Sequence, residues 1–240
     1  MTCRLLIWVI LLLSSPSWAD GIHLKIAVQE GYDKLLVIQE LEDFFVQSLK
    51  REGITVSFTP LPLGRSSSLV SKGTLDGELI RSELVAQNYP NIIISSKPLG
   101  FIEYHILYKI KNTTINEDQL NKSRGLVILN TLTVKEDLKR RDLGAEEISS
   151  IEQGLQMLKS GRADYLILPD PIIASLKISS PKTFVDVRIG KQYFQKVPLY
   201  FCLNKKHLEL LPKIEKALSK SLQEKSKEYK LLYDFFNPNF

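Results

Sequence analysis

Apolar residues recur along the chain in two alternating patterns. Residues 24–28 and 54–58 are short runs rich in branched side chains, which predict β-strands. Between them the apolar side chains recur every three or four positions, as on the buried face of a helix: Leu35, Ile38, Leu41, Phe45 and Leu49. Strands that alternate with helices indicate parallel βαβ units, so we expect an α/β fold.

One connection between a helix and a strand occurs twice. A helical pattern ends at Gly73 and again at Gly161, and an aspartate, Asp76 or Asp164, follows three residues later and opens an apolar run. Glycine suits a helix C-terminus because it adopts the left-handed conformation freely. The copies lie about 90 residues apart, which is too long for a solenoid repeat and fits two similar small α/β lobes. Two lobes imply a cleft between them.

The second half of the chain repeats the pattern of the first. A predicted strand, residues 104–110, is followed by the polar residues 111–123, which we expect to cross between the lobes. Residues 125–129 then restart the pattern as a strand, and residues 151–160 form a helix. A last amphipathic helix begins near Pro212.

These elements predict how the chain is divided. Residues 20–110 should form the first part of lobe 1, residues 111–197 lobe 2, and residues 198–240 a segment that returns to lobe 1. Two extended crossings, near Ile110 and Pro198, should then act as the hinge.

The first 19 residues have the pattern of a signal peptide. Arg4 precedes a run of nine apolar residues, 5–13, and the small residues Ser17 and Ala19 suit signal peptidase. The apolar run is much shorter than the roughly 20 residues that a membrane-spanning helix needs. We therefore expect a mature chain that begins near Asp20 and is exported to the periplasm.

Charge and chemistry exclude several classes of function. The net charge of +5 is modest and basic residues alternate with acidic ones, so nucleic acid is not an expected partner. The three histidines, His23, His105 and His207, lack the spacing of a metal site and accompany no plausible nucleophile. We expect no cofactor, no metal and no catalytic residue, but a monomer that binds a small molecule.

Several motifs together resemble a known family. Residues 62–65, 73–77, 96–99 and 153–164, followed by a C-terminal amphipathic helix, are similar in order and spacing to the family 3, amino-acid-type periplasmic solute-binding proteins. The resemblance implies a type II periplasmic-binding-protein fold. In that fold two α/β lobes close like a clamshell on a small solute, which is typically delivered to an ABC importer.

The candidate ligand contacts follow the ends of the predicted strands. In open α/β sheets, ligands bind beyond the carboxyl ends of the strands, where the N–H groups of helix N-termini favour anions. The residues in such places are Glu30, Tyr32, Glu78, Arg81, Asn130, Thr131 and Asp170.

The chain departs from the family at the residues that hold an amino acid. The family's arginine, some dozen residues after the first Gly-x-x-Asp, is replaced by Asn88 or Tyr89, and Arg81 could substitute because a guanidinium binds a carboxylate through two parallel hydrogen bonds. The family's acidic ligand contact falls at Pro169, one position before Asp170. The resemblance therefore does not by itself imply a standard α-amino acid, and we expect a small polar solute that is anionic or amino-acid-like.

Three functions are compatible with this sequence. The first is a receptor that passes its solute to an ABC permease, and the second is a sensor that presents its ligand to a membrane receptor. The third is a periplasmic dehydratase or lyase on the same scaffold, in which Glu78 near Arg81 would be the general base.

Overall fold

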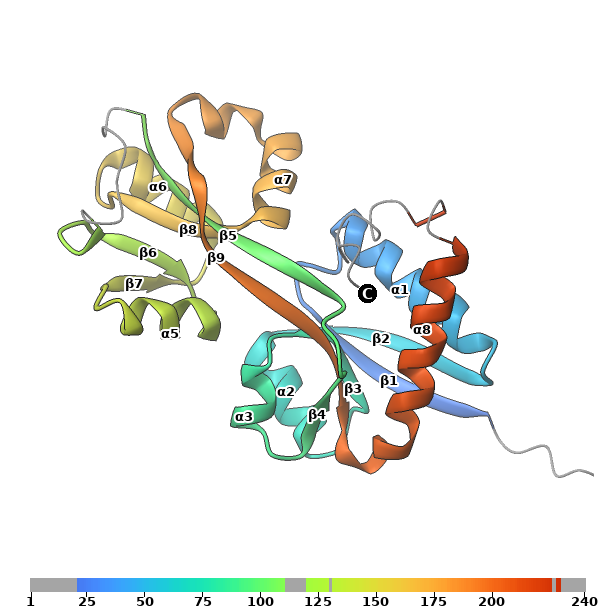
Figure 1. The fold of residues 1–240 in the computed structure, drawn as a ribbon. Coiled ribbons are helices and arrows are strands. Elements are labelled where there is room, and N and C mark those ends of the chain that lie inside the picture. Colours follow the sequence, from blue (N-terminus) through green and yellow to red (C-terminus); the bar gives the residue numbers. More distant parts are fainter. Residues whose placement is uncertain (1–20, 111–119, 130, 226–227, 230–240) are drawn as a thin grey trace, which may run out of the picture.

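The protein consists of two α/β lobes joined by two long strands (Figure 1). The computed structural model describes residues 21–110, 120–129, 131–225 and 228–229. The expected signal peptide, residues 1–19, lies outside the described residues. The first lobe contains β1 (Ile22–Gln29), α1 (Leu36–Lys50), β2 (Ile54–Leu61), α2 (Leu63–Ser71), β3 (Gly77–Arg81), α3 (Leu84–Asn88) and β4 (Ile92–Ile94).

The second lobe follows in the chain, and the last elements return to the first lobe. The second lobe contains β5 (Gly100–Lys109), β6 (Gly125–Ile128), α5 (Leu132–Arg140), β7 (Ala145–Ile148), α6 (Ile151–Ser160), β8 (Tyr165–Pro169), α7 (Asp170–Ser179) and η1 (Pro181–Val185). The returning segment contains β9 (Val187–Asn204), η2 (Lys205–Leu210) and α8 (Leu211–Lys225). None of the helices in the described part of the chain is both long and apolar enough to cross a membrane.

The two lobes share one strand order. In the first lobe β1 lies between β2 and β3 and is parallel to both, and in the second lobe β6 lies between β7 and β8 in the same way. Each parallel set then gains antiparallel strands, β9 and β4 in the first lobe and β5 and β9 in the second. The α/β fold and the repeated lobes predicted from the sequence are therefore confirmed.

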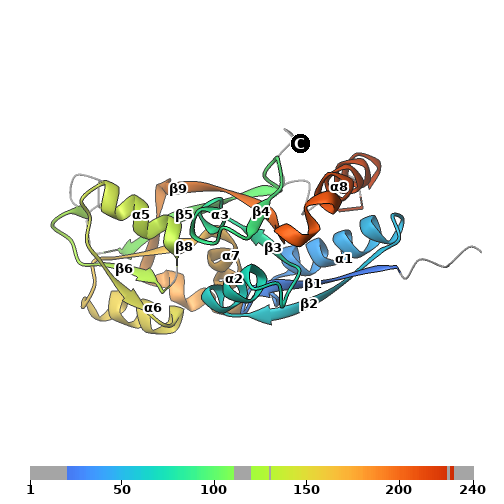
Figure 2. The same ribbon diagram turned by 90° about the horizontal axis from the view of Figure 1, so that it is seen from below.

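The first crossing between the lobes differs from the one expected. β5 pairs with β8 in the second sheet from Tyr104 to Tyr108, so the first crossing is made by the N-terminal part of β5 and not near Ile110. β9 is one continuous strand that pairs with β5 up to Leu199 and with β3 from Tyr200, so the second crossing lies next to Pro198, where the sequence predicts it. Both views show β5 and β9 running between the lobes (Figures 1 and 2). The polarity of residues 111–123 misled the prediction, because a polar stretch marks a loop but not which sheet the preceding strand joins.

Each lobe has its own apolar core. In the first lobe α1 buries Leu41 and Phe45 against the sheet, and α8 adds Ile214 and Leu218 to the same cluster. In the second lobe α6 buries Leu158 against β6 and β8. The buried positions recur at helical spacing, which is why these segments fold as helices over their sheets.

The repeated connection has the same geometry in both lobes. Gly73 and Gly161 have φ angles of +76° and +74°, the left-handed conformation expected at these helix ends. The N–H of Asp76 donates to the carbonyl of Lys25 (2.8 Å), and the N–H of Lys25 donates back to Asp76 Oδ2 (2.8 Å).

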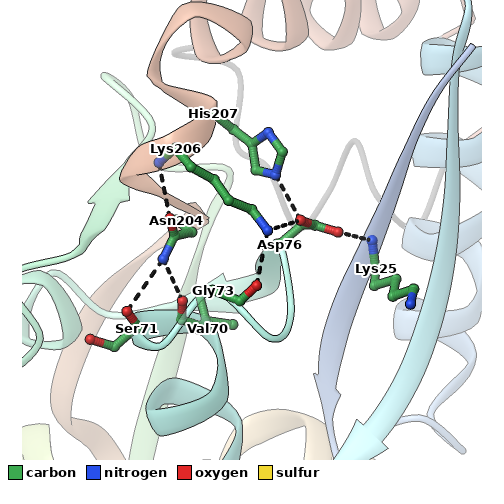
Figure 3. Close-up of polar contacts among 8 residues, drawn as sticks. All are labelled: Lys25, Val70, Ser71, Gly73, Asp76, Asn204, Lys206 and His207. Atoms are coloured by element: carbon green, nitrogen blue, oxygen red, sulfur yellow. Dashed lines mark hydrogen bonds and ion pairs between the residues drawn. The ribbon is translucent and has the colours of Figure 1, made fainter.

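The second copy repeats this ring of hydrogen bonds and adds the same kind of cation. The N–H of Asp164 donates to the carbonyl of Arg124 (2.9 Å), and the N–H of Arg124 donates to Asp164 Oδ2 (2.8 Å). A basic side chain also donates to each glycine carbonyl, Lys206 Nζ to Gly73 (2.9 Å, Figure 3) and Arg124 Nη2 to Gly161 (2.8 Å). The aspartate thus fixes each turn onto the neighbouring strand.

Gly161→Ala is expected to lower the free energy of unfolding by about 1 kcal/mol, because a Cβ disfavours the left-handed conformation. Urea unfolding measures the loss. Gly144→Ala is a matched control, since its φ angle is not in the left-handed region and a Cβ there meets no heavy atom within 4 Å. Equal losses in the two variants would contradict a conformational role for Gly161.

Candidate binding cleft between the lobes

A cavity of about 80 Å³ lies between the two lobes. Its walls come from the carboxyl ends of β1 and β3, the first turns of α2 and α5, and the crossing strands β5 and β9. The lining residues are Gln29, Tyr32, Leu63, Ile80, Arg81, Ser82, Val85, Ile102, Tyr104, Thr131, Leu132, Thr133, Val197 and Leu199. The cavity therefore occupies the place where α/β sheets bind ligands.

Arg81 is the charged side chain of this lining. It is the last residue of β3, and its side chain is 13% exposed. Its Nε lies 3.5 Å from Glu78 Oε1, too far for a well-formed hydrogen bond, and is buried without a hydrogen-bond partner. A largely buried guanidinium in the lining of a cavity is suited to receive an anionic group.

Glu78 lies behind Arg81 and does not line the cavity. Its carboxylate accepts hydrogen bonds from Ser66 Oγ (2.6 Å) and Ser67 Oγ (3.0 Å), both on α2. Burial raises the pKa of Glu78, while Arg81 and the two serines act in the opposite direction. The carboxylate is thus held by α2 and in turn positions the guanidinium.

A register shift in β3 allows this pairing. Residues three apart in a regular strand point to opposite faces of the sheet. The pairing of β3 with β9 shifts between Glu78 and Arg81, as at a β-bulge. Because a bulge changes the direction of the following side chain, both residues lie on one side and Arg81 reaches the cavity.

Two tyrosines lie on the cavity wall. Tyr32 follows β1, and it packs against apolar residues of both lobes. Tyr104 is on β5, where burial raises the pKa of its phenol to about 12 despite the lowering effects of Thr133 and Arg81. Burial also raises the pKa of Tyr32. Both rings are therefore neutral at ordinary pH and offer an apolar face and a hydroxyl group.

The N-terminus of α5 faces the cavity from the second lobe. Thr131 is the N-cap residue, and its side chain makes no capping hydrogen bond. Figures 1 and 2 show α5 on the side of the second lobe that lies toward α3. The free N–H groups of a first helical turn favour a negative charge. This end of α5 and Arg81 would therefore attract the same anionic group from opposite lobes.

The structure brings together only part of the predicted site. Tyr32, Arg81 and Thr131 line the cavity. Glu30 is exposed and does not line it, and Asn130 lies outside the described residues. Asp170, at the start of α7, accepts a hydrogen bond from the N–H of Glu103 (3.1 Å) and is not part of the lining.

Sequence reasoning missed several lining residues. Gln29, Ser82 and Thr133 each lie within two residues of a predicted contact, so a wider window around the strand ends would have included them. Tyr104 had no such signal, because it lies inside a strand that the sequence places in lobe 1. Only the position of β5 as a crossing strand explains its place at the cleft.

The described residues contain no group of three histidine, cysteine, aspartate or glutamate side chains that could hold a metal ion. The chemistry available at the cavity is that of a guanidinium, amides, hydroxyl groups and aromatic rings.

Comparison with known proteins identifies the fold. No protein-family description matches the sequence, and no curated protein matches it. Among solved structures, an ancestral arginine-binding protein bound to arginine is 20% identical, with a TM-score of 0.67 over 88% of this chain and 96% of that chain.

Two further structures have receptor roles. The GluR0 ligand-binding core of Nostoc punctiforme in complex with glutamate is 16% identical, with a TM-score of 0.69 over 90% of this chain and 100% of that chain. A histidine kinase sensor domain with similarity to periplasmic binding proteins is 14% identical, with a TM-score of 0.72 over 90% of this chain and 96% of that chain. At these identities the likeness establishes the architecture alone: the chain has the two-lobed fold of type II periplasmic binding proteins.

Proposed function

We propose that the protein is an extracytoplasmic solute-binding protein that captures a small anionic or amino-acid-like solute between its lobes for ABC-type import. The observation that carries the proposal is Arg81, whose largely buried side chain is the charged group among the described residues that line a cavity between the lobes. A guanidinium in such a place can form charge-assisted hydrogen bonds with an anion that enters the cavity. Similar folds that bind arginine or glutamate support capture of a small molecule.

A sensor is the second candidate function. The solved structures of the same fold include a histidine kinase sensor domain and the GluR0 ligand-binding core, and these support a role in sensing a ligand. An enzymatic role has less support, because the proposed base, Glu78, accepts hydrogen bonds from two serines and does not face the cavity.

The proposal predicts stabilisation and compaction by a ligand. A solute that binds only the folded protein raises its melting temperature by mass action, so a thermal-shift screen of small acids and amino acids should give at least one hit. Small-angle scattering should then show a smaller radius of gyration with the ligand, because closure rotates the lobes about β5 and β9. An unchanged radius at saturation would contradict the clamshell mechanism.

Export to the periplasm is part of the proposal. It is supported by the apolar run and by the small residues that end at Ala19. The intact mass of protein recovered from the periplasm should correspond to a chain that begins near Asp20. Recovery of the uncleaved chain in membranes would contradict this prediction.

A further inference from the structure

The cavity lining contains a positive charge but no negative charge among the described residues. Among the fourteen described residues that line it, seven are aliphatic, six are neutral and polar, and one, Arg81, is charged. An α-amino acid carries an ammonium group as well as a carboxylate. A buried ammonium needs a negative partner, because removing a charge from water costs several kcal/mol per ion unless it is paired.

Glu78 and Asp170, two carboxylates that the sequence predicts as ligand contacts, already have partners. Glu78 is covered by Arg81 and holds the hydroxyl groups of Ser66 and Ser67, at 2.6 and 3.0 Å. Asp170 accepts the N–H of Glu103 and is outside the lining. Gln29 and the hydroxyl groups of the lining offer acceptor oxygens without charge, so an ammonium beside Arg81 would be repelled by the guanidinium and would have no ion-pair partner among the described lining residues.

The remaining surface suits an apolar body. Ile80, Ile102, Val197 and Leu199 pack in one cluster with the two tyrosines, and Leu63 also lines the cavity. The volume of about 80 Å³ is far below the 300–1,000 Å³ of pockets for drug-sized ligands. A molecule that fits has one anionic group and a short apolar chain.

We infer that the cleft selects small monocarboxylates that lack an amine over the corresponding α-amino acids. The carboxylate binds Arg81 and the N-terminus of α5, and the chain contacts the aliphatic residues and tyrosines. This inference rests on the proposed function, since it names the class of solute that the same site captures.

Three matched pairs of probes test this selectivity. In each pair an acid is compared with its amino derivative: butanoate with 2-aminobutanoate, pentanoate with norvaline, and 4-methylpentanoate with leucine. Titration calorimetry on the purified protein should give at least a tenfold lower Kd for the acid, which corresponds to about 1.4 kcal/mol. Equal or tighter binding of the amino acids overturns the inference and leaves the proposed function intact. If no member of any pair binds at millimolar concentration, both the inference and the capture of such solutes are overturned.

Two variants separate charge balance from shape. Leu132→Asp places a carboxylate at the cavity, in the first turn of α5 where an acidic residue is compatible with the helix dipole, and should reduce the preference for the acid to less than threefold. Asp170→Asn removes a carboxylate outside the lining and should leave the preference unchanged. If Asp170→Asn instead weakens amino-acid binding selectively, Asp170 is the ammonium partner and the inference is wrong.

Discussion

Arg81→Ala is expected to weaken ligand binding by about thirty-fold or more. The guanidinium is largely buried and is the charged group among the described residues that line the cavity, so it is the expected partner of an anionic group of the ligand. Loss of one partner of a desolvated charge pair costs about 2–5 kcal/mol, and 2 kcal/mol corresponds to about thirty-fold in Kd. Titration calorimetry with the tightest-binding small acid measures the change.

Two further substitutions make this result specific. Arg81→Lys should also weaken binding, because an ammonium cannot reproduce the planar fork of a guanidinium. Arg65→Ala removes an exposed arginine of α2 and should leave affinity unchanged. If Arg81→Ala binds within about twofold of the wild type, a difference below roughly 0.5 kcal/mol, Arg81 is not a ligand contact.

Local signals in the sequence predict most of the fold. Gly73 and Gly161 mark helix ends because only a left-handed residue fits there, and the helical prediction for residues 151–160 matches α6. Helix ends and helix positions depend mainly on residues that are close along the chain, so they can be predicted without knowledge of the tertiary structure. The repeated lobes follow from the repetition of the same signals.

The first crossing and the pairing of Glu78 with Arg81 depend on contacts between strands that are far apart in the sequence. Residues 100–109 have a strand pattern, but nothing in their composition states that β8 is their partner. The sequence predicts both Glu78 and Arg81 as ligand contacts. The regular alternation of side chains along a strand would nevertheless place them on opposite faces of the sheet. The register shift against β9 brings them together, and such a shift is a property of two strands far apart in the sequence.

Asp76 shows how the repeated turn connects distant segments. Its Oδ1 lies 2.7 Å from His207 Nε2 and 2.8 Å from Lys206 Nζ, while Oδ2 accepts the N–H of Lys25 (Figure 3). The carboxylate therefore joins the start of β3 to β1 and to the segment between β9 and α8. This cluster lies at the opposite end of β3 from Arg81, so its role is in stability and not in ligand contact.

Asp76→Asn is expected to lower the free energy of unfolding at pH 7 by about 2 kcal/mol. Although partial burial acts to raise its pKa, Lys206, the N–H of Lys25 and His207 hold the pKa of Asp76 at about 2, against an ordinary value of 3.8. A shift of this size is worth about 2 kcal/mol at 1.36 kcal/mol per unit. The amide retains the shape but loses the charge, and its NH₂ group cannot accept a hydrogen bond in whichever of the two oxygen positions it occupies, toward Lys206 and His207 or toward the N–H of Lys25.

The sign of the shift fixes the pH dependence. A carboxyl group with a lowered pKa in the folded state stabilises the protein above its unfolded pKa, and this contribution disappears as the pH falls through the folded value. The difference between wild type and Asp76→Asn in urea unfolding should therefore be full above about pH 5, be small by about pH 2 and vanish near pH 1. Asp164→Asn, in the more exposed copy of the turn, should cost less, because solvent screens its contact with Arg124. An Asp76→Asn deficit that persists unchanged at pH 2 would show that its charge does not stabilise the cluster.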